Sequence, residues 1–303
     1  MAKNLVVILG PTASGKTLIA ARLAWDLHGE IISADSRQVY RGMDIGTGKD
    51  LNQYIIDGEK IPYHMIDIID PQEEFNLFEF QKRFYEIFSQ IRNKGHLPIL
   101  VGGTGLYLQS VLSRYEMPEA LPEPELRKDL EQKSLEELKE IFFDFKPNLH
   151  NKTDSENKQR LIRAIEIELV RNKRNSEQKE RPEIDAAVFG ISCERSILRK
   201  RITLRLEERL KQGMIEEVER LHTVGLSWSR LDSFGLEYRY ISQYLQNMIS
   251  FDEMKIKLNT AIHQFAKRQE TWFRRMERKG IAIKWIKANE CDLLKESVIK
   301  QFE

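Results

Sequence analysis

The strongest chemical signal lies close to the amino terminus, in the residues Gly10-Pro11-Thr12-Ala13-Ser14-Gly15-Lys16-Thr17. They match the pattern G-x-x-x-x-G-K-[ST] at every position. In such a loop the backbone N–H groups turn towards an anion, the lysine adds a positive charge, and the last hydroxyl holds Mg²⁺. The apolar run Leu5–Leu9 before the loop and the helical pattern of residues 17–28 after it fit this interpretation. We therefore predict a site for a phosphate or diphosphate group, with a glycine-rich turn that binds nothing as the alternative.

Two further loops carry polar residues where a parallel sheet binds its ligands. Asp35 follows a short strand predicted over residues 31–34, and Thr104 follows another over residues 98–101, inside a glycine-rich turn. The carboxyl ends of parallel strands meet at one edge of a sheet. A carboxylate there can help to hold Mg²⁺, as in kinases. Either segment alone could be a structural turn, but three such loops together favour one shared site.

The elements that must position these loops alternate between strand and helix patterns. Short apolar runs and helical periodicities follow one another over residues 5–9, 17–28, 31–34, 77–92 and 98–101. This alternation is typical of right-handed crossovers in a parallel sheet. After residue 113 the chain becomes proline-rich, helical and highly charged, and strand character returns at residues 187–191. We predict a P-loop NTPase-like α/β core from residues 1–112 and 186–303, with residues 113–185 inserted as a small helical subdomain.

Charge is distributed unevenly along the chain. The 48 basic and 47 acidic residues among 303 give a net charge of +1, which excludes a uniformly basic nucleic-acid binder. Residues 50–80 nevertheless hold eight acids and one base, whereas residues 255–284 hold nine bases and two acids. A helical pattern in the basic stretch carries Lys267, Arg268, Gln269, Trp272, Arg274 and Arg275. Basic and aromatic residues on one helix indicate contacts with a nucleic-acid backbone, with a solvated helix face as the alternative.

Composition limits the remaining classes. Cys193 and Cys291 are the two cysteines of the chain, too few for a disulfide framework or a four-thiolate zinc site. The sequence contains no run of about 18 apolar residues, so it predicts no membrane span. The first apolar run, residues 5–9, is too short for the apolar region of a signal peptide. We therefore expect a reduced, cytoplasmic protein.

Together these residues resemble the tRNA dimethylallyltransferase (tRNA isopentenyltransferase) family, in its bacterial type without a zinc finger. The most diagnostic stretch is Asp35-Ser36-Arg37-Gln38-Val39-Tyr40, which continues to residue 47. The other matching stretches, in the family's order, are residues 10–17, 64–71, 101–107, 159–164, 266–269 and 272–274. The chain departs from the family at Gly235-Leu236-Glu237-Tyr238, where relatives usually have Gly-Tyr-x-Glu.

The resemblance implies transfer of a dimethylallyl group from dimethylallyl diphosphate to N6 of adenine 37, beside the anticodon. The tRNAs concerned would read codons that start with U, and diphosphate would be released. This chemistry is physically reasonable. The exocyclic amine is a weak nucleophile, so most of the reactivity must come from the electrophile. An allylic C–O bond opens towards a stabilised cation when the departing diphosphate is stabilised electrostatically.

The resemblance also implies roles for individual residues. Lys16, with Mg²⁺ on Thr17, would stabilise the diphosphate; Thr104 would touch it, and Arg205 would grip it from the opposite side. Asp35 would take the proton from N6, which requires the adenine to leave its stack. The family's tRNA contacts map onto Asp35, Ser36, Arg37, Gln38, Thr104, Gln159, Arg160, Leu161, Ile162 and Arg163, with Arg127 as a further candidate, and we add the basic helix.

Three alternatives remain at this point. An adenylate isopentenyltransferase would use the same site parts on a free nucleotide. Two basic elements nevertheless favour a long polyanion: residues 255–284 and the inserted subdomain, which carries Arg160, Arg163, Arg171, Lys173 and Arg174. A P-loop kinase would transfer a phosphoryl group from ATP. A non-catalytic RNA-binding module would contain the basic surfaces without the chemistry. We expect a monomer that binds tRNA and dimethylallyl diphosphate.

Overall fold

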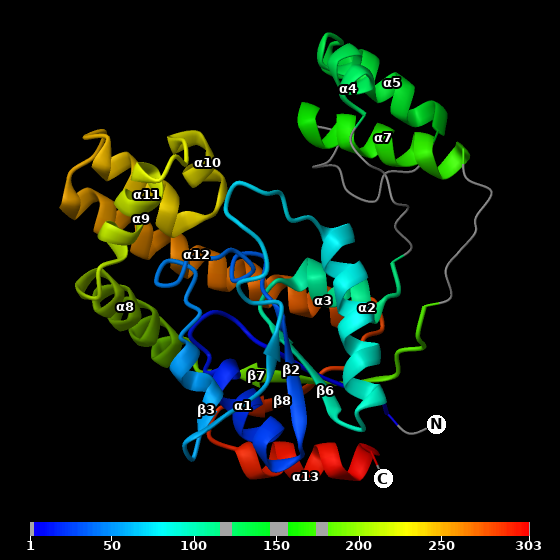
Figure 1. Ribbon diagram of the computed structural model, residues 1–303, viewed down its shortest axis with the longest axis vertical. Helices are drawn as coiled ribbons and strands as arrows, with labels where there is room; N and C mark the ends of the chain where they lie inside the picture. The colour runs from blue at the N-terminus through cyan, green and yellow to red at the C-terminus, as the bar shows by residue number, and fades with distance from the viewer. Residues whose placement is uncertain (1–2, 116–122, 146–156, 174–180, 303) are drawn as a thin grey trace. The chain divides into compact units, whose positions relative to one another are not determined.

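The computed structural model describes residues 3–115, 123–145, 157–173 and 181–302, and the chain forms two compact units. The first, the sheet unit, contains Met1–Tyr115 and Pro182–Glu303. The second, the helical unit, contains Glu116–Arg181. Both units are visible in Figure 1.

A six-stranded sheet forms the centre of the sheet unit, in the order β5-β2-β6-β1-β7-β8. All five pairings between neighbouring strands are parallel. The strands are β1 (Leu5–Leu9), β2 (Gly29–Ala34), β5 (Tyr63–His64), β6 (Leu97–Gly102), β7 (Ala186–Ser192) and β8 (Lys284–Lys287). Every residue of β1 is buried, as its uninterrupted apolar sequence predicts for a strand covered on both faces.

Helices cover both faces of the sheet. Val6 and Ile8 of β1 pack on the side of α1 (Lys16–Asp26) and α13 (Cys291–Phe302). The alternate residues Leu5, Val7 and Leu9 pack on the side of α2, α3 and the end of α12. These helices are α2 (Leu77–Asn93), α3 (Gly105–Leu112) and α12 (Phe251–Arg278) (Figure 1). The predicted α/β fold, a parallel sheet flanked by helices, is confirmed.

A third core lies over the segment between β2 and α2. Here buried residues of positions 39–69 pack against the helices that precede α12 and against α12 itself. These helices are α8 (Arg195–Lys211), α9 (Met214–Thr223), α10 (Trp228–Ser233) and α11 (Leu236–Leu245). The segment also contains η1 (Leu51–Tyr54), β3 (Ile55–Ile56) and β4 (Glu59–Lys60), of which the last two pair antiparallel.

The helical unit has its own small core. Its described helices are α4 (Pro124–Glu131), α5 (Leu135–Phe145) and α7 (Lys158–Lys173). Leu130, Leu138, Phe142, Leu161 and Ile165 bury their side chains together. Across the described ranges of both units, no helix is long and apolar enough to cross a membrane.

Three of the four predicted strands, β2, β6 and β7, are longer in the structure than in the sequence pattern, whereas β1 has the predicted bounds. The strand expected at residues 31–34 begins at Gly29 and therefore includes Glu30, a charged residue that is 2% exposed. Its carboxylate bonds to His64 and His96 at 2.7 Å each and to Lys94 at 3.0 Å. Burial would raise the pKa of Glu30, but these partners outweigh it and lower the pKa to about 2. Side chains distant in the sequence thus offset the free-energy cost of burying a charged carboxylate in a strand.

Candidate active site

The three polar loops predicted from the sequence open into one cavity of about 540 Å³ in the sheet unit. They meet because β2, β6 and β1 are neighbours in the sheet, so their carboxyl ends lie at the same edge. The loop residues that line the cavity are Thr12, Lys16, Thr17, Asp35, Ser36, Arg37, Gln38, Gly102, Gly103, Thr104, Gly105 and Leu106.

The glycine-rich loop, residues 10–17, joins β1 to α1 and presents the start of that helix. Gly15 is the N-cap residue, with a φ of 89°, and no side chain caps the helix. The first N–H groups of α1 are therefore open to an anion, in a place that the helix dipole makes favourable. Burial and the nearby charge of Arg205 lower the pKa of Lys16 to about 8, although Asp35 opposes the shift. A bound anion would relieve this electrostatic cost.

Asp35 is held by the backbone that follows it. Its Oδ1 accepts hydrogen bonds from the N–H groups of Arg37 at 2.8 Å and Gln38 at 3.4 Å. One carboxylate oxygen is thus fixed by local geometry, and the group lines the cavity. The Gln38 amide donates to the Gly48 carbonyl oxygen at 3.1 Å and accepts from the Ser33 hydroxyl at 3.1 Å, so this side chain joins β2 to the cavity wall.

Residues of α12 form the wall beside Thr104, the N-cap residue of α3. The Gln269 amide donates to the Gly103 carbonyl oxygen at 2.9 Å and accepts from the Thr12 N–H at 2.8 Å. Gln269 is 8% exposed and also lines the cavity, so its side chain joins the two loops there, and the predicted contact with RNA stays a prediction. Trp272 lies against Gly105, where a Cβ atom would be 2.3 Å from the indole ring.

The opposite wall consists of α8 and the start of α11. Arg205 and Arg209 of α8 line the cavity with Glu237, and both arginines contact Asp50. Burial raises the pKa of Glu237, against the opposing effect of Arg209 and Arg205. The departure from the family pattern at residues 235–238 therefore falls on the cavity wall itself.

The other predicted tRNA contacts divide between the two units. On α12, Lys267, Arg268 and Arg274 are exposed, and the Arg275 guanidinium lies 5.8 Å from the Trp272 ring centroid. Arg268 also lines the cavity. Basic side chains thus follow the helix that forms one wall.

In the helical unit the predicted tRNA contacts differ in exposure and in their side-chain partners. Gln159 and Arg160 are exposed at the start of α7. Arg127 binds the buried Glu166 through two bonds of 3.0 Å, and Arg163 binds it at 3.0 Å. Leu161 and Ile162 are 0% and 1% exposed, so their side chains build the core instead of a binding surface. The expectation for these two side chains is corrected, because they occupy the inward face of α7.

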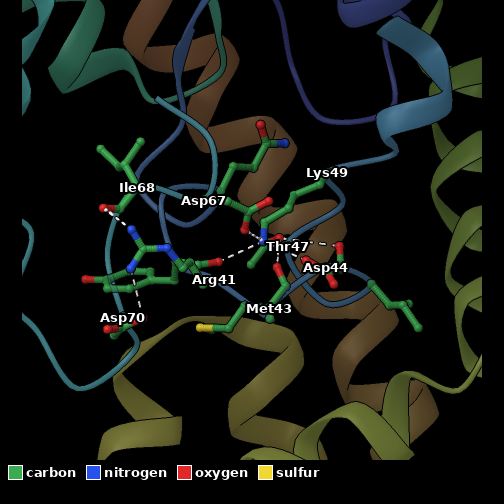
Figure 2. A network of polar contacts seen from close by, with 12 residues as sticks. Arg41, Met43, Asp44, Thr47, Lys49, Asp67, Ile68 and Asp70 are labelled. Atoms are coloured by element: carbon green, nitrogen blue, oxygen red, sulfur yellow. Dashed lines mark hydrogen bonds and ion pairs between the residues drawn. The ribbon is translucent and has the colours of Figure 1, made fainter. Parts of the chain in front are cut away.

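Sequence reasoning missed the residues that fix the loop of residues 40–50. Figure 2 shows Lys49 between Asp44 and Asp67; its Nζ also donates to the Tyr40 carbonyl oxygen at 2.7 Å. Lys49 is 2% exposed. A lysine in a segment rich in acids was the available signal, but the pattern does not reveal which acids it meets.

Glu217 of α9 holds the same loop from the other side. Its carboxylate accepts the backbone N–H groups of Asp44, Ile45 and Gly46 at 2.7–3.0 Å. Tyr238 donates its hydroxyl to the same carboxylate at 2.7 Å. Because Gly46, Thr47 and Gly48 line the cavity, Glu217 shapes the site without lining it.

The donor atoms at the cavity fit Mg²⁺ bound together with a diphosphate. Among the residues that the structure describes, no cluster of three or more His, Cys, Asp or Glu side chains could hold a metal alone. Mg²⁺ commonly uses one or two protein oxygens and completes its shell with phosphate and water. The Thr17 hydroxyl, beside the open start of α1, is suited to that role.

Comparisons with known proteins identify the family of the chain. A family model described as IPP transferase matches residues 38–276. A tRNA dimethylallyltransferase 1 of Syntrophus aciditrophicus is 57% identical over 98% of both chains. One of Geotalea uraniireducens is 54% identical over 98% of this chain and 96% of its own. The structure of a Bacillus halodurans tRNA isopentenylpyrophosphate transferase aligns with a TM-score of 0.71 and 30% identity, over 99% and 97% of the two chains.

The parallel sheet and its glycine-rich loops define a P-loop-like α/β transferase. The chain belongs to the IPP transferase family of prenyltransferases, and the curated relatives reported above are named tRNA dimethylallyltransferase. The family resemblance stated from the sequence is thereby confirmed.

Proposed function

We propose that this protein transfers the dimethylallyl group of dimethylallyl diphosphate to N6 of adenine 37 in tRNAs reading codons that start with U. The observation that carries the proposal is the meeting of three loops with Arg205 around one cavity. Its volume of about 540 Å³ lies in the range of small-ligand sites. The curated relatives, at 57% and 54% identity, bear the name of this activity.

In this proposal the glycine-rich loop binds the diphosphate of the donor. The open N–H groups of α1, the Lys16 ammonium and the Arg205 guanidinium stabilise the charge that develops as the allylic C–O bond breaks. Thr104 adds a hydroxyl from the neighbouring loop. When bound at Thr17, Mg²⁺ supplies further positive charge to the leaving group. Electrostatic stabilisation of diphosphate, rather than phosphoryl transfer, is thus the task of this loop.

Asp35 acts on the acceptor. As the new C–N bond forms, N6 of adenine becomes more acidic and its proton passes to the Asp35 carboxylate, with diphosphate as the other product. The hydrogen bonds that hold Oδ1 keep the group oriented while the base is out of its stack. Ser36, Arg37, Gln38 and Trp272 line the same cavity and provide polar and stacking surfaces for the flipped nucleotide.

The anticodon stem-loop binds along basic surfaces. Lys267, Arg268, Arg274 and Arg275 follow α12, and they suit contacts with the phosphate backbone. In the helical unit, Gln159, Arg160 and the Glu166-bound Arg127 and Arg163 are the proposed contacts. Because its proposed substrate is tRNA, we place the protein in the cytoplasm. One chain contains all the proposed site residues, so the chemistry requires no second copy, and a monomer is the proposed state.

Mass analysis of nucleosides tests the proposal. The protein is incubated with dimethylallyl diphosphate, Mg²⁺ and bulk tRNA, and digested nucleosides are examined for N6-(dimethylallyl)adenosine. A parallel reaction supplies AMP in place of tRNA, and another supplies ATP without the prenyl donor. Prenylation of tRNA supports the proposal, whereas AMP as the sole acceptor indicates a free-nucleotide enzyme. Phosphoryl transfer from ATP without the donor indicates a kinase.

A further inference from the structure

At the cavity wall, Arg205 belongs to a cluster of opposite charges whose other two members, Asp50 and Arg209, have no role in the mechanism above. Asp50, the residue before η1, hydrogen-bonds Nη2 of Arg205 through its Oδ2, and Nη2 of Arg209 lies 3.4 Å from the same oxygen. Burial alone would raise the pKa of Asp50, but the two arginines outweigh burial and keep the pKa below its ordinary value. One carboxylate therefore joins two guanidinium groups of α8.

The backbone near Asp50 is shaped to reach these arginines. Gly48 has a φ of 67°, and a Cβ atom there would lie 1.9 Å from Nη2 of Arg209. Asp50 itself adopts the left-handed region, with a φ of 41°. A side chain at position 48 would displace the guanidinium and would strain the left-handed backbone, so glycine suits this position. The loop thus closes directly on the two arginines.

The same loop is anchored on its interior side. Lys49, the neighbour of Asp50, is buried among Asp44, Asp67 and the Tyr40 carbonyl oxygen (Figure 2). Glu217 binds three successive N–H groups just before it. Two consecutive residues therefore have separate tasks: Lys49 anchors the loop, and Asp50 contacts the cations at the cavity.

The cations need such a partner. Lys16, Arg205 and Arg209 line the cavity together, and the charge of Arg205 contributes to the lowered pKa of Lys16. Like charges that line one cavity repel each other, and a long arginine side chain can reduce this repulsion by turning into solvent. A fixed carboxylate opposes that movement and limits the rotamers of Arg205.

We propose that Asp50 is a positioning residue, which holds the Arg205 guanidinium at the cavity so that it meets the diphosphate of the donor. This inference rests on the proposed role of Arg205. It predicts that Asp50 acts on donor binding and on the leaving group only through Arg205. The opposite behaviour, in which Asp50 competes with the diphosphate for Arg205, would make donor binding tighter when Asp50 is lost.

Steady-state kinetics of Asp50→Asn test the inference. Asparagine keeps the size and tolerates the left-handed backbone, but it lacks the charge. We expect kcat/KM for dimethylallyl diphosphate to fall by about 10- to 100-fold, with KM for tRNA unchanged. Asp57→Asn is the matched control, because Asp57 also has a left-handed φ, of 51°, and pairs with an arginine, Arg22, at 3.2 Å. That variant should behave as wild type.

A double-mutant cycle separates this inference from the proposed function. In an Arg205→Gln background, adding Asp50→Asn should change kcat/KM by less than about twofold, since the group it positions is gone. Three results would each overturn this inference and leave the proposed function standing. They are additive losses in the double variant, wild-type donor kinetics of Asp50→Asn, and tighter donor binding by Asp50→Asn. If Arg205→Gln itself leaves donor kinetics unchanged, the proposed role of Arg205 is wrong. Asp50→Glu, which restores the charge, should recover part of the loss, and failure to do so in a folded variant would also count against it.

Discussion

The side-chain amide of Gln269 donates a hydrogen bond of 2.9 Å to the carbonyl oxygen of Gly103, across 166 positions of the sequence. Its amide oxygen accepts from the Thr12 N–H, so one residue of α12 ties together two of the loops that line the cavity. The position of the glycine-rich loop relative to Thr104 therefore depends on a side chain from a distant helix.

Gln269→Ala should weaken both the fold and the chemistry. The variant leaves a buried N–H and a buried carbonyl oxygen without their partner, which lowers the free energy of unfolding by about 1–3 kcal/mol. We expect a fall in kcat/KM for the donor larger than any change in tRNA affinity. Urea denaturation and donor kinetics measure the two effects. Gln264→Ala, on an exposed position of the same helix, is the control. Loss of tRNA affinity with intact donor kinetics would instead show that Gln269 contributes to tRNA binding.

Gln269 also shows where prediction from the sequence stops. The strands β1, β2, β6 and β7, the glycine-rich loop and the polar loops after β2 and β6 could be predicted, because short apolar runs and local spacing determine them. The short edge strands β5 and β8 were not predicted. The inward face of a helix depends on what packs against it. For that reason Gln269, Leu161 and Ile162 looked like parts of basic, RNA-facing stretches, although the structure buries their side chains.

The loop of residues 40–50 shows a second limit. Glu217 and the N–H groups that it accepts are separated by more than 170 positions. No periodicity or composition connects such partners, and a glutamate in an amphipathic helix ordinarily indicates a solvated face. Asp50 was visible only as a member of the acidic segment of residues 50–80, and Lys49 precedes that segment. Asp50 meets its arginines because α8 packs against the loop, whereas Lys49 meets Asp44 and Asp67 because the loop folds back on itself.

Asp35→Ala should reduce turnover strongly with little effect on tRNA affinity. In our mechanism Asp35 takes a proton in the chemical step, and such groups contribute about 10²–10⁴-fold. Single-turnover rates and a tRNA binding assay on the same preparation distinguish the two quantities. Ser36→Ala, at the adjacent cavity position, should cost much less in rate. An equal loss of rate and affinity for Asp35→Ala would mean that Asp35 serves binding.

Replacing Arg274 and Arg275 with Ala should weaken tRNA binding and reduce its dependence on salt. Each lost phosphate contact lowers the slope of log K against log salt concentration by roughly one. Filter binding at several salt concentrations measures this slope. Lys257→Ala is the control, since Lys257 lies on the same helix and its Nζ is 4.0 Å from Glu253. If the double variant keeps the wild-type slope, the RNA follows another surface.

Glu217→Ala should destabilise the protein, because three backbone N–H groups and the Tyr238 hydroxyl lose a buried carboxylate. We expect the free energy of unfolding to fall by about 2–4 kcal/mol. Glu216→Ala, the exposed neighbour on α9, should change stability by less than about 0.5 kcal/mol. Chemical denaturation compares the two variants. Equal stabilities would show that water replaces the carboxylate at these N–H groups.

Donor binding should weaken as the pH rises through about 8. Burial, with the charge of Arg205, lowers the pKa of Lys16 to about 8, so the ammonium is present below that pH and is lost above it. A diphosphate prefers the charged form and raises the pKa of Lys16 when it binds, so binding above pH 8 takes up a proton. The affinity for dimethylallyl diphosphate is therefore constant between pH 7 and 7.5 and falls by up to tenfold per pH unit above about 8. Calorimetric titrations in buffers of different ionisation enthalpy measure both the affinity and the proton uptake. Lys16→Arg keeps its charge throughout this range and should lose the pH dependence; a decline unchanged in that variant would assign it to another group.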